Sequence, residues 1–136
     1  MAFVLDSSVA LAWLLPDEDS TAADALADRL EGEAAVVPAI WRLEVGNALL
    51  TARRRKRLAD RDLERLVAAM IDLPIEQEGF LDDGALSKVM ALARKLGMTS
   101  YDATYLELAQ RRRIPLATLD ARLREASATA GVAVLP

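Results

Sequence analysis

Cysteine and histidine are both absent from this sequence of 136 residues. Their absence excludes disulfide bridges, thiolate nucleophiles, the usual zinc ligand sets, the Ser-His-Asp triad and a histidine general base. Catalytic chemistry in this chain must therefore use carboxylates, hydroxyls, lysine, arginine or a bound cation.

Long apolar runs are also lacking. None approaches the roughly 18 to 20 residues that span a bilayer, and the N-terminal segment MAFVLDSS has neither the basic region nor the cleavage site of a signal peptide. We therefore predict a cytoplasmic protein with no membrane partner. The net charge of −4 argues against a generally basic nucleic-acid-binding protein, but the cations are mostly Arg and unevenly placed, so local patches matter more.

Apolar side chains make up 53% of the chain, enough for one compact domain spanning residues 1–136. Short β-prone segments alternate with helical ones, which predicts right-handed crossovers and an α/β fold with a mostly parallel central sheet flanked by helices. The predicted strands are 3–5, 35–38, 73–77, 115–119 and 132–135. The predicted helices are 9–15, 20–31, 39–57, 60–72, 83–96, 99–113 and 120–130, with Gly97 capping the helix over 83–96.

Two acidic residues, Asp6 and Asp120, directly follow apolar strand segments. In α/β folds, ligands bind beyond the carboxyl ends of the strands, so both side chains are directed toward the expected site. The alternative interpretation is that each is the N-cap of the following helix.

Asp102 lies on the inward face of its predicted helix, together with Tyr105, while Thr104 and Glu107 are predicted on the opposite face. The alternative is a capping box in which Thr99 is the N-cap and Asp102 follows three residues later. Both interpretations are compatible, since a carboxylate at a helix start can also face a pocket.

Glu44 repeats this pattern in its own helix, where Arg42 and Arg53 mark the solvent face. Asn47 and Thr51 lie near Glu44 and form a narrow polar stripe in apolar surroundings. The alternative is a buried glutamate satisfied by one arginine or by backbone groups, because an unpaired buried carboxylate is costly.

Four acids that converged would repel one another, raise at least one pKa and destabilise the fold. A divalent cation removes that repulsion, and oxygen ligands select Mg²⁺ or Mn²⁺. Such an ion can activate a water and stabilise charge on a phosphodiester. The sequence thus predicts a catalytic metal site at Asp6, Glu44, Asp102 and Asp120, and leaves open which carboxylate accepts the proton.

Hydroxyl and amide groups near these acids are candidates for a supporting role. Ser7 and Thr118 are predicted to hold metal-bound water or a phosphate oxygen, and Asn47 is predicted to support Glu44. Ser8 is interpreted as a turn residue.

Two arginine clusters end the helices that carry Glu44 and Asp102. They are candidates for RNA phosphate contact, or alternatively helix C-terminal cations on a solvated face. The candidate RNA-binding residues are Arg53, Arg54, Arg55, Arg111 and Arg112.

Four segments together resemble the PIN-domain ribonucleases, in particular the VapC-type toxins of toxin-antitoxin pairs. They are VLDSSVALAWLL, WRLEVGNAL around Glu44, TSYDATYLELA around Asp102, and LATLD ending at Asp120. This resemblance covers essentially the whole chain in order. It implies a PIN-like parallel-sheet fold, Mg²⁺ or Mn²⁺ at the four acids, endoribonuclease cleavage of structured RNA such as tRNA or rRNA, homodimerisation, and a small VapB-type antitoxin as partner.

The chain departs from that family at one place. Many relatives have a further acid shortly after the fourth carboxylate, whereas here Asp120 is followed by Ala121, Arg122, Leu123 and Arg124. We therefore expect one tightly bound ion.

Three other functions are weighed against the nuclease. A haloacid-dehalogenase-type phosphotransferase needs a second Asp where this chain has Ser8, and a receiver-like phosphoacceptor module needs adjacent acids and a late-strand Lys that are missing. A catalytically inactive PIN-like RNA-binding or interaction domain remains an alternative, which the presence of all four acids disfavours.

Overall fold

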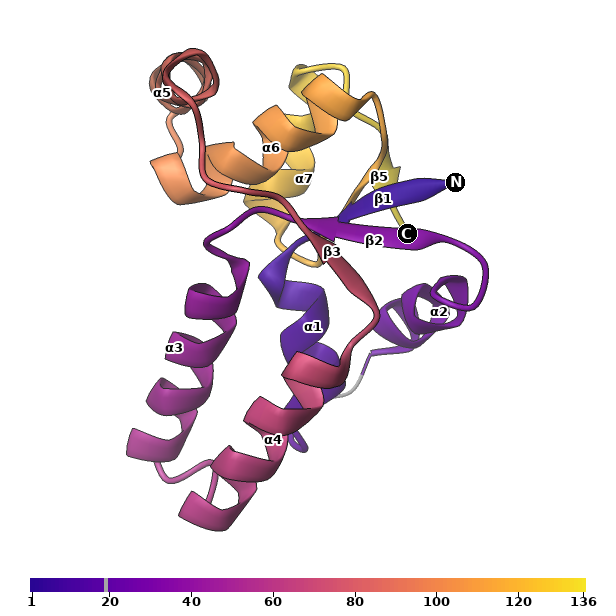
Figure 1. Cartoon of the computed structure of the whole chain (residues 1–136), viewed down its shortest axis with the longest axis vertical. Helices are drawn as coiled ribbons and strands as arrows, with labels where there is room; N and C mark the ends of the chain where they lie inside the picture. The colour runs from indigo at the N-terminus through magenta and orange to yellow at the C-terminus, as the bar shows by residue number, and fades with distance from the viewer. Residues whose placement is uncertain (19) are drawn as a thin grey trace.

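The computed structural model describes residues 1–18 and 20–136. This part of the chain forms five strands and seven helices in an α/β arrangement (Figure 1). The strands are β1 (Ala2–Leu5), β2 (Ala34–Val37), β3 (Ile75–Gln77), β4 (Leu116–Ala117) and β5 (Val134–Leu135). The helices are α1 (Ser7–Leu14), α2 (Thr21–Arg29), α3 (Trp41–Arg54), α4 (Asp60–Asp72), α5 (Asp83–Leu96), α6 (Ser100–Arg112) and α7 (Ala121–Thr129).

The sheet has the strand order β3-β2-β1-β4-β5, and every neighbouring pair is parallel. The register aligns Phe3 of β1 with Ala35 of β2, and Val4 with Leu116 of β4. The chain builds outward from β1 through β2 to β3, then returns across the sheet and adds β4 on the other side of β1. This reversal creates a topological switch point between β1 and β4, where α/β folds bind ligands.

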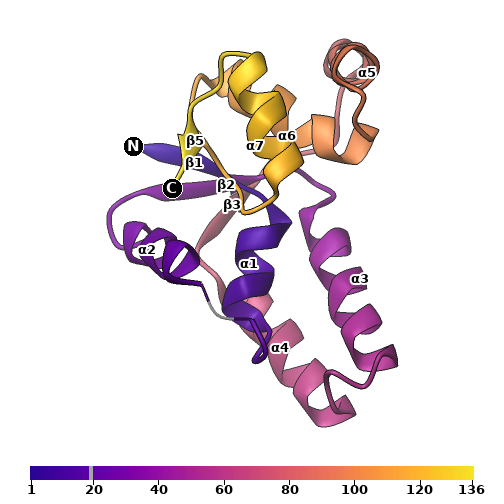
Figure 2. The same ribbon diagram turned by 180° about the vertical axis from the view of Figure 1, so that it is seen from behind.

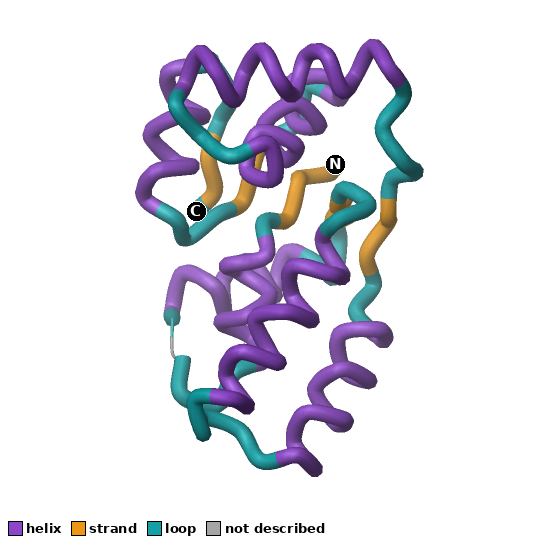
Figure 3. Tube along the Cα trace, turned by 90° about the vertical axis from the view of Figure 1, so that its left-hand side faces the viewer, coloured by secondary structure: helices purple, strands orange, loops and turns teal. Residues whose placement is uncertain are grey.

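Helices cover both faces of the sheet (Figures 1 and 2). Helices α1 to α4 lie on one face, and α5 to α7 lie on the other. Helices α3 and α4 run side by side and project away from the strands (Figure 3). Because both faces are covered, the β1 side chains Phe3, Val4 and Leu5 are fully buried, as expected for a parallel sheet. The predicted mostly parallel α/β fold is confirmed.

Local sequence signals explain where several helices begin and end. The bounds of α4 and α5 are those predicted, and Gly97 ends α5 in the left-handed conformation, with its N–H donating to the carbonyl oxygen of Ala93. The helix predicted over 39–57 instead ends at Arg54. The reason is that Lys56 has a φ of 60°, which a right-handed helix cannot accommodate.

Two strands are shorter than predicted. The segments predicted over 115–119 and 132–135 pair over only two residues each, in β4 and β5. Thr118 directly follows β4, and its backbone N–H still donates to the carbonyl oxygen of Leu135 in β5 at 3.2 Å, so it lies at the carboxyl end of the sheet, beside the candidate site.

The predicted solvent face of α6 is wrong at two positions. Thr104 and Glu107 are only 6% and 2% exposed. The cause is that α6 lies between the sheet on one side and α5 on the other, so both its faces are covered. Helical periodicity alone distinguishes faces only when one of them meets water.

Candidate active site

Asp6 and Asp120 flank the switch point between β1 and β4. Asp6 follows β1 directly and is 5% exposed, whereas Asp120 precedes α7 and is exposed. The Asp120 carboxylate caps α7, since its Oδ1 accepts hydrogen bonds from the N–H groups of Arg122 at 2.8 Å and Leu123 at 3.2 Å. The capping interpretation therefore holds for Asp120. Asp6 occupies the N-cap position of α1 without a side-chain capping bond.

Two hydroxyl groups tie the end of β1 to the end of β4. Thr118 Oγ1 donates to Asp6 Oδ2 at 2.7 Å and accepts from the backbone N–H of Asp120 at 3.0 Å. Ser8 Oγ donates to the same Asp6 oxygen at 2.6 Å and accepts from the backbone N–H of Leu119 at 3.0 Å. Thr118 therefore links the first and fourth acids through one side chain.

The hydroxyl beside Asp6 on α1 belongs to Ser8, which the sequence interpretation had assigned to a turn. Ser7 was predicted to support the site, but it has no hydrogen bond to Asp6 through its hydroxyl in the described part of the chain. Ser8 lies two residues beyond Asp6 in the first turn of α1, where its side chain can reach both Asp6 and the segment after β4. The spacing from Asp6 to a serine was the available signal, but two serines compete for it.

Glu44 and Asp102 come from the first turns of α3 and α6. The hydroxyl of Tyr105, also on α6, donates to Glu44 Oε1. Thr99 caps α6 by accepting from the N–H of Asp102 at 3.1 Å, as predicted. The sequence interpretation treated Tyr105 only as a neighbour of Asp102 on the inward face, and its contact with Glu44 is new.

Burial raises the pKa values of three of the four acids, and the charges of other acids in the set contribute for two of them. Burial raises the pKa of Asp6, and hydrogen bonds from Ser8 and Thr118 oppose that rise. Burial also raises the pKa of Glu44, against the Tyr105 hydrogen bond, and the charges of Asp6 and Asp102 raise it further. For Asp102, burial is again the largest cause of a raised pKa, followed by the charges of Asp6 and Asp120.

The carboxylate oxygens of these four acids are the kind of ligand that a hard divalent cation prefers. The hydrogen bonds to Glu44 fall on Oε1 and those to Asp120 on Oδ1, so within the described residues Oε2 and Oδ2 have no hydrogen-bond partner. Across residues 1–18 and 20–136, no three acidic side chains are arranged to enclose an ion together. Mg²⁺ does not need such a cage, because it is usually bound by one or two carboxylates and keeps several waters.

Asn47 does not join this cluster. Its side chain is exposed and lines a groove between α3 and α4 with Leu43 and Leu63. It lies nearly one helical turn beyond Glu44, on the outer side of α3. The predicted support of Glu44 comes instead from Tyr105 on another helix.

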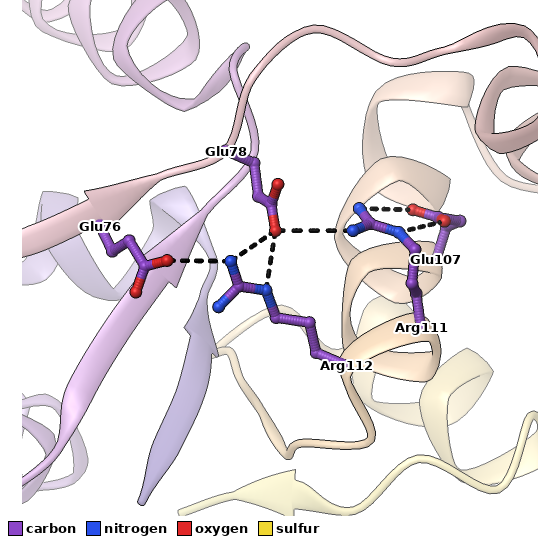
Figure 4. A network of polar contacts seen from close by, with 5 residues as sticks. All are labelled: Glu76, Glu78, Glu107, Arg111 and Arg112. Atoms are coloured by element: carbon purple, nitrogen blue, oxygen red, sulfur yellow. Dashed lines mark hydrogen bonds and ion pairs between the residues drawn. The ribbon is translucent and has the colours of Figure 1, made fainter.

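The predicted RNA-binding arginines of α6 are occupied by glutamates (Figure 4). Arg111 donates to Glu107 at 2.9 Å, and Arg112 donates to Glu78 at 2.7 Å and Glu76 at 2.9 Å. Because the three glutamates outnumber the two arginines, this network presents no surplus positive charge. It joins the end of α6 to β3 and the residues just after it.

The arginines at the end of α3 are more exposed. Arg53 forms an ion pair with Asp60, Arg54 donates to Thr51 at 3.1 Å, and Arg55 is exposed in the turn after the helix. Their proposed contact with RNA stays a prediction.

A family model for the PIN domain matches residues 3–128, so the chain belongs to the PIN domain family. The fold is similar to the crystal structure of PAE2754 from Pyrobaculum aerophilum, with 26% identity, coverage of 98% of this chain and 92% of that one, and a TM-score of 0.64. The comparison with curated proteins finds no match.

Two further solved structures share the fold at lower identity. VapC20 of Mycobacterium tuberculosis, described as a sarcin-ricin-loop-cleaving toxin, is 17% identical to this chain. The match covers 98% of this chain and 99% of VapC20, with a TM-score of 0.69. In VapBC2 of Rickettsia felis, bound to a promoter DNA fragment, the matching chain is 8% identical. The match covers 98% of this chain and 97% of that one, with a TM-score of 0.69. Among the helices of residues 1–18 and 20–136, none has the length and apolarity to cross a membrane.

Proposed function

We propose that this PIN-domain protein is a Mg²⁺- or Mn²⁺-dependent endoribonuclease. The observation that carries the proposal is the link that Thr118 makes between Asp6 and the backbone of Asp120 at the switch point of the sheet. Supporting it, the charges of other acids in the set raise the pKa values of Glu44 and Asp102. A cluster of partly buried, mutually repelling carboxylates is unfavourable for stability alone, and it is the arrangement that a divalent cation would stabilise.

The four carboxylates would hold the ion, which when bound supplies an activated water and charge stabilisation at a phosphodiester. Hydroxyl groups of the chain position two of these carboxylates. Thr118 and Ser8 fix the Asp6 carboxylate, and the Tyr105 hydroxyl fixes Glu44. One of the four carboxylates would accept the proton of the attacking water.

The test is cleavage of RNA by purified protein. We expect cleavage with Mg²⁺ or Mn²⁺, none with EDTA, and loss of activity in Asp6→Asn and Asp102→Asn without unfolding. Asp72→Asn, an exposed acid at the end of α4, is the matched control and should stay active. Equal cleavage by all of these variants would remove the acids from the mechanism. RNA binding without cleavage by the native protein would favour the inactive-domain alternative.

The toxin role is a further part of the proposal. It is supported by the fold shared with VapC20 and with the toxin of VapBC2. The substrate would then be structured RNA of the tRNA or rRNA class in the cytoplasm, with homodimerisation and neutralisation by a VapB-type antitoxin. Induced expression should arrest growth, co-expression of a short neighbouring reading frame should restore it, and Asp102→Asn should not arrest growth. Growth arrest that persists with Asp102→Asn would contradict a nuclease-based toxin.

A further inference from the structure

A groove opens beside Asp102 at one edge of the acid cluster. It is bounded by the turn between α5 and α6 and by the first part of α7, and its volume is 370 Å³. That volume lies within the range of about 300 to 1,000 Å³ typical of small-ligand sites. Leu96 and Met98 contribute apolar wall, Thr99 and Asp102 contribute polar atoms, and Glu125 of α7 adds a second carboxylate.

Arg122 is the cation that lines this groove, and in the described part of the chain it is without an ion pair. The neighbouring Arg124 differs, because its guanidinium donates to the carbonyl oxygens of Thr118 and Pro136 at 3.2 Å. Arg111 and Arg112 are paired with glutamates. Arg122 therefore has a guanidinium that intramolecular contacts leave available.

The backbone of Arg122 is held in place by the cluster itself. Its N–H donates to Asp120 Oδ1 at 2.8 Å, which sets the start of α7 and fixes where the Arg122 side chain leaves the backbone. Arg122 thus follows one candidate ligand by two residues and lines the same groove as another, Asp102. Such placement on a capped helix is more rigid than placement on a loop.

RNA has a negative phosphate at every nucleotide, and the acid cluster repels the phosphates beside the one that is cleaved. A cation next to the cluster offsets that repulsion, and arginine does so with a planar fork that binds phosphate oxygens in pairs. We propose, building on the proposed nuclease function, that this groove binds the RNA strand adjacent to the scissile bond, with Arg122 on a flanking phosphate.

The experiment measures binding of a short fluorescein-labelled single-stranded RNA by Asp6→Asn protein, in which the proposed function predicts that RNA stays intact. Into this parent are introduced Arg122→Ala, Arg122→Lys and the matched control Arg61→Ala, an exposed arginine on α4. We expect about tenfold weaker binding for Arg122→Ala and partial recovery for Arg122→Lys. The salt dependence, as the slope of log affinity against log salt, should fall by ~0.7 for one lost phosphate contact.

Arg61→Ala should match the parent in affinity and slope. If Arg122→Ala also matches it while the parent binds RNA, this inference is wrong and the proposed nuclease stands. Weaker binding with an unchanged salt slope would likewise exclude a phosphate contact. A parent that binds no RNA, with or without Mg²⁺, would overturn both the inference and the proposed function.

Discussion

Thr118 holds the two strand-end acids together, and replacing it with valine tests this role while keeping its shape. Its side chain is fully buried, donates to Asp6 and accepts from the Asp120 N–H. Loss of a hydrogen bond to a charged group costs about 1.5 to 3 kcal/mol, and an orphaned N–H about 1 to 3 kcal/mol. With some offset from the added methyl group, Thr118→Val should lower the free energy of unfolding by about 3 kcal/mol.

The loss should depend on pH in a defined direction. The Thr118 hydroxyl favours the ionised form of Asp6, so its removal raises an Asp6 pKa that burial has already raised in the folded protein. The full loss is therefore present above the folded pKa of Asp6 and shrinks as pH falls through it, because the carboxyl is then protonated with or without the hydroxyl. Urea unfolding in EDTA at about pH 7 and about pH 4 measures both values.

Thr104→Val is the matched control. Thr104 is also buried, but its hydroxyl donates only to the backbone carbonyl of Ser100, at 2.7 Å. The change should cost about 1 kcal/mol at both pH values. A Thr118→Val loss no larger than this, and equal at the two pH values, would refute the assigned role of Thr118.

Three other substitutions test neighbouring contacts. Asp102→Asn should stabilise the metal-free protein at neutral pH, because the folded pKa of Asp102 is raised above its unfolded value and the ionised carboxylate is therefore destabilising. This loss of folding free energy develops as pH rises through the unfolded and then the folded pKa. Thermal melting should show Mg²⁺ stabilising native protein more than the variant. Tyr105→Phe should reduce the rate of RNA cleavage about tenfold or more, measured in single turnovers, because Glu44 loses the hydroxyl that holds it. Glu107→Gln should lower the urea midpoint, by about 1 to 3 kcal/mol in free energy, because it weakens the pairing of a buried carboxylate with Arg111.

Each of these three predictions would be contradicted by a specific result. Asp102→Asn that melts below native protein in EDTA would mean that the ionised carboxylate is not destabilising. An unchanged single-turnover cleavage rate in Tyr105→Phe would mean that the Tyr105 hydroxyl does not contribute to catalysis through Glu44. Glu125→Gln, an exposed change on α7, is the control for Glu107→Gln, and equal urea midpoints for both would contradict the structural role of the network.

Much of the fold was readable from the sequence because local signals agreed with the tertiary structure. Acidic residues in the first turn and apolar periodicity predicted the bounds of α4, and Gly97 ends α5 where predicted. The end of α3 was misplaced because Arg55 and Lys56 have good helix propensity, whereas Lys56 adopts a left-handed conformation that local preference disfavours. Strand order came from the structure, since alternation of elements does not specify which strand lies beside β1.

The four acids could be proposed from the sequence because each obeys a local rule, following a strand or lying on an inward helix face. Their supporting groups obey no such rule. The contacts of Tyr105 with Glu44 and of Thr118 with Asp6 join residues distant in the chain, so periodicity gives no information about them. The same limitation hid the burial of Glu107, whose side chain is covered by elements that lie far from it in sequence.

The supporting groups also clarify why the cluster is tolerated in the fold. Each of the contacts from Ser8, Thr118 and Tyr105 places a donor on a carboxylate and lowers its pKa, yet the pKa values of Asp6 and Glu44 remain raised by burial. The hydrogen bonds therefore compensate only part of the loss of hydration. A scaffold selected for stability alone would add further donors or replace the acids, because a buried charge without full compensation is destabilising. The uncompensated part is what binding of a divalent cation would remove, so the proposed metal site would relieve the same burial that raises these pKa values.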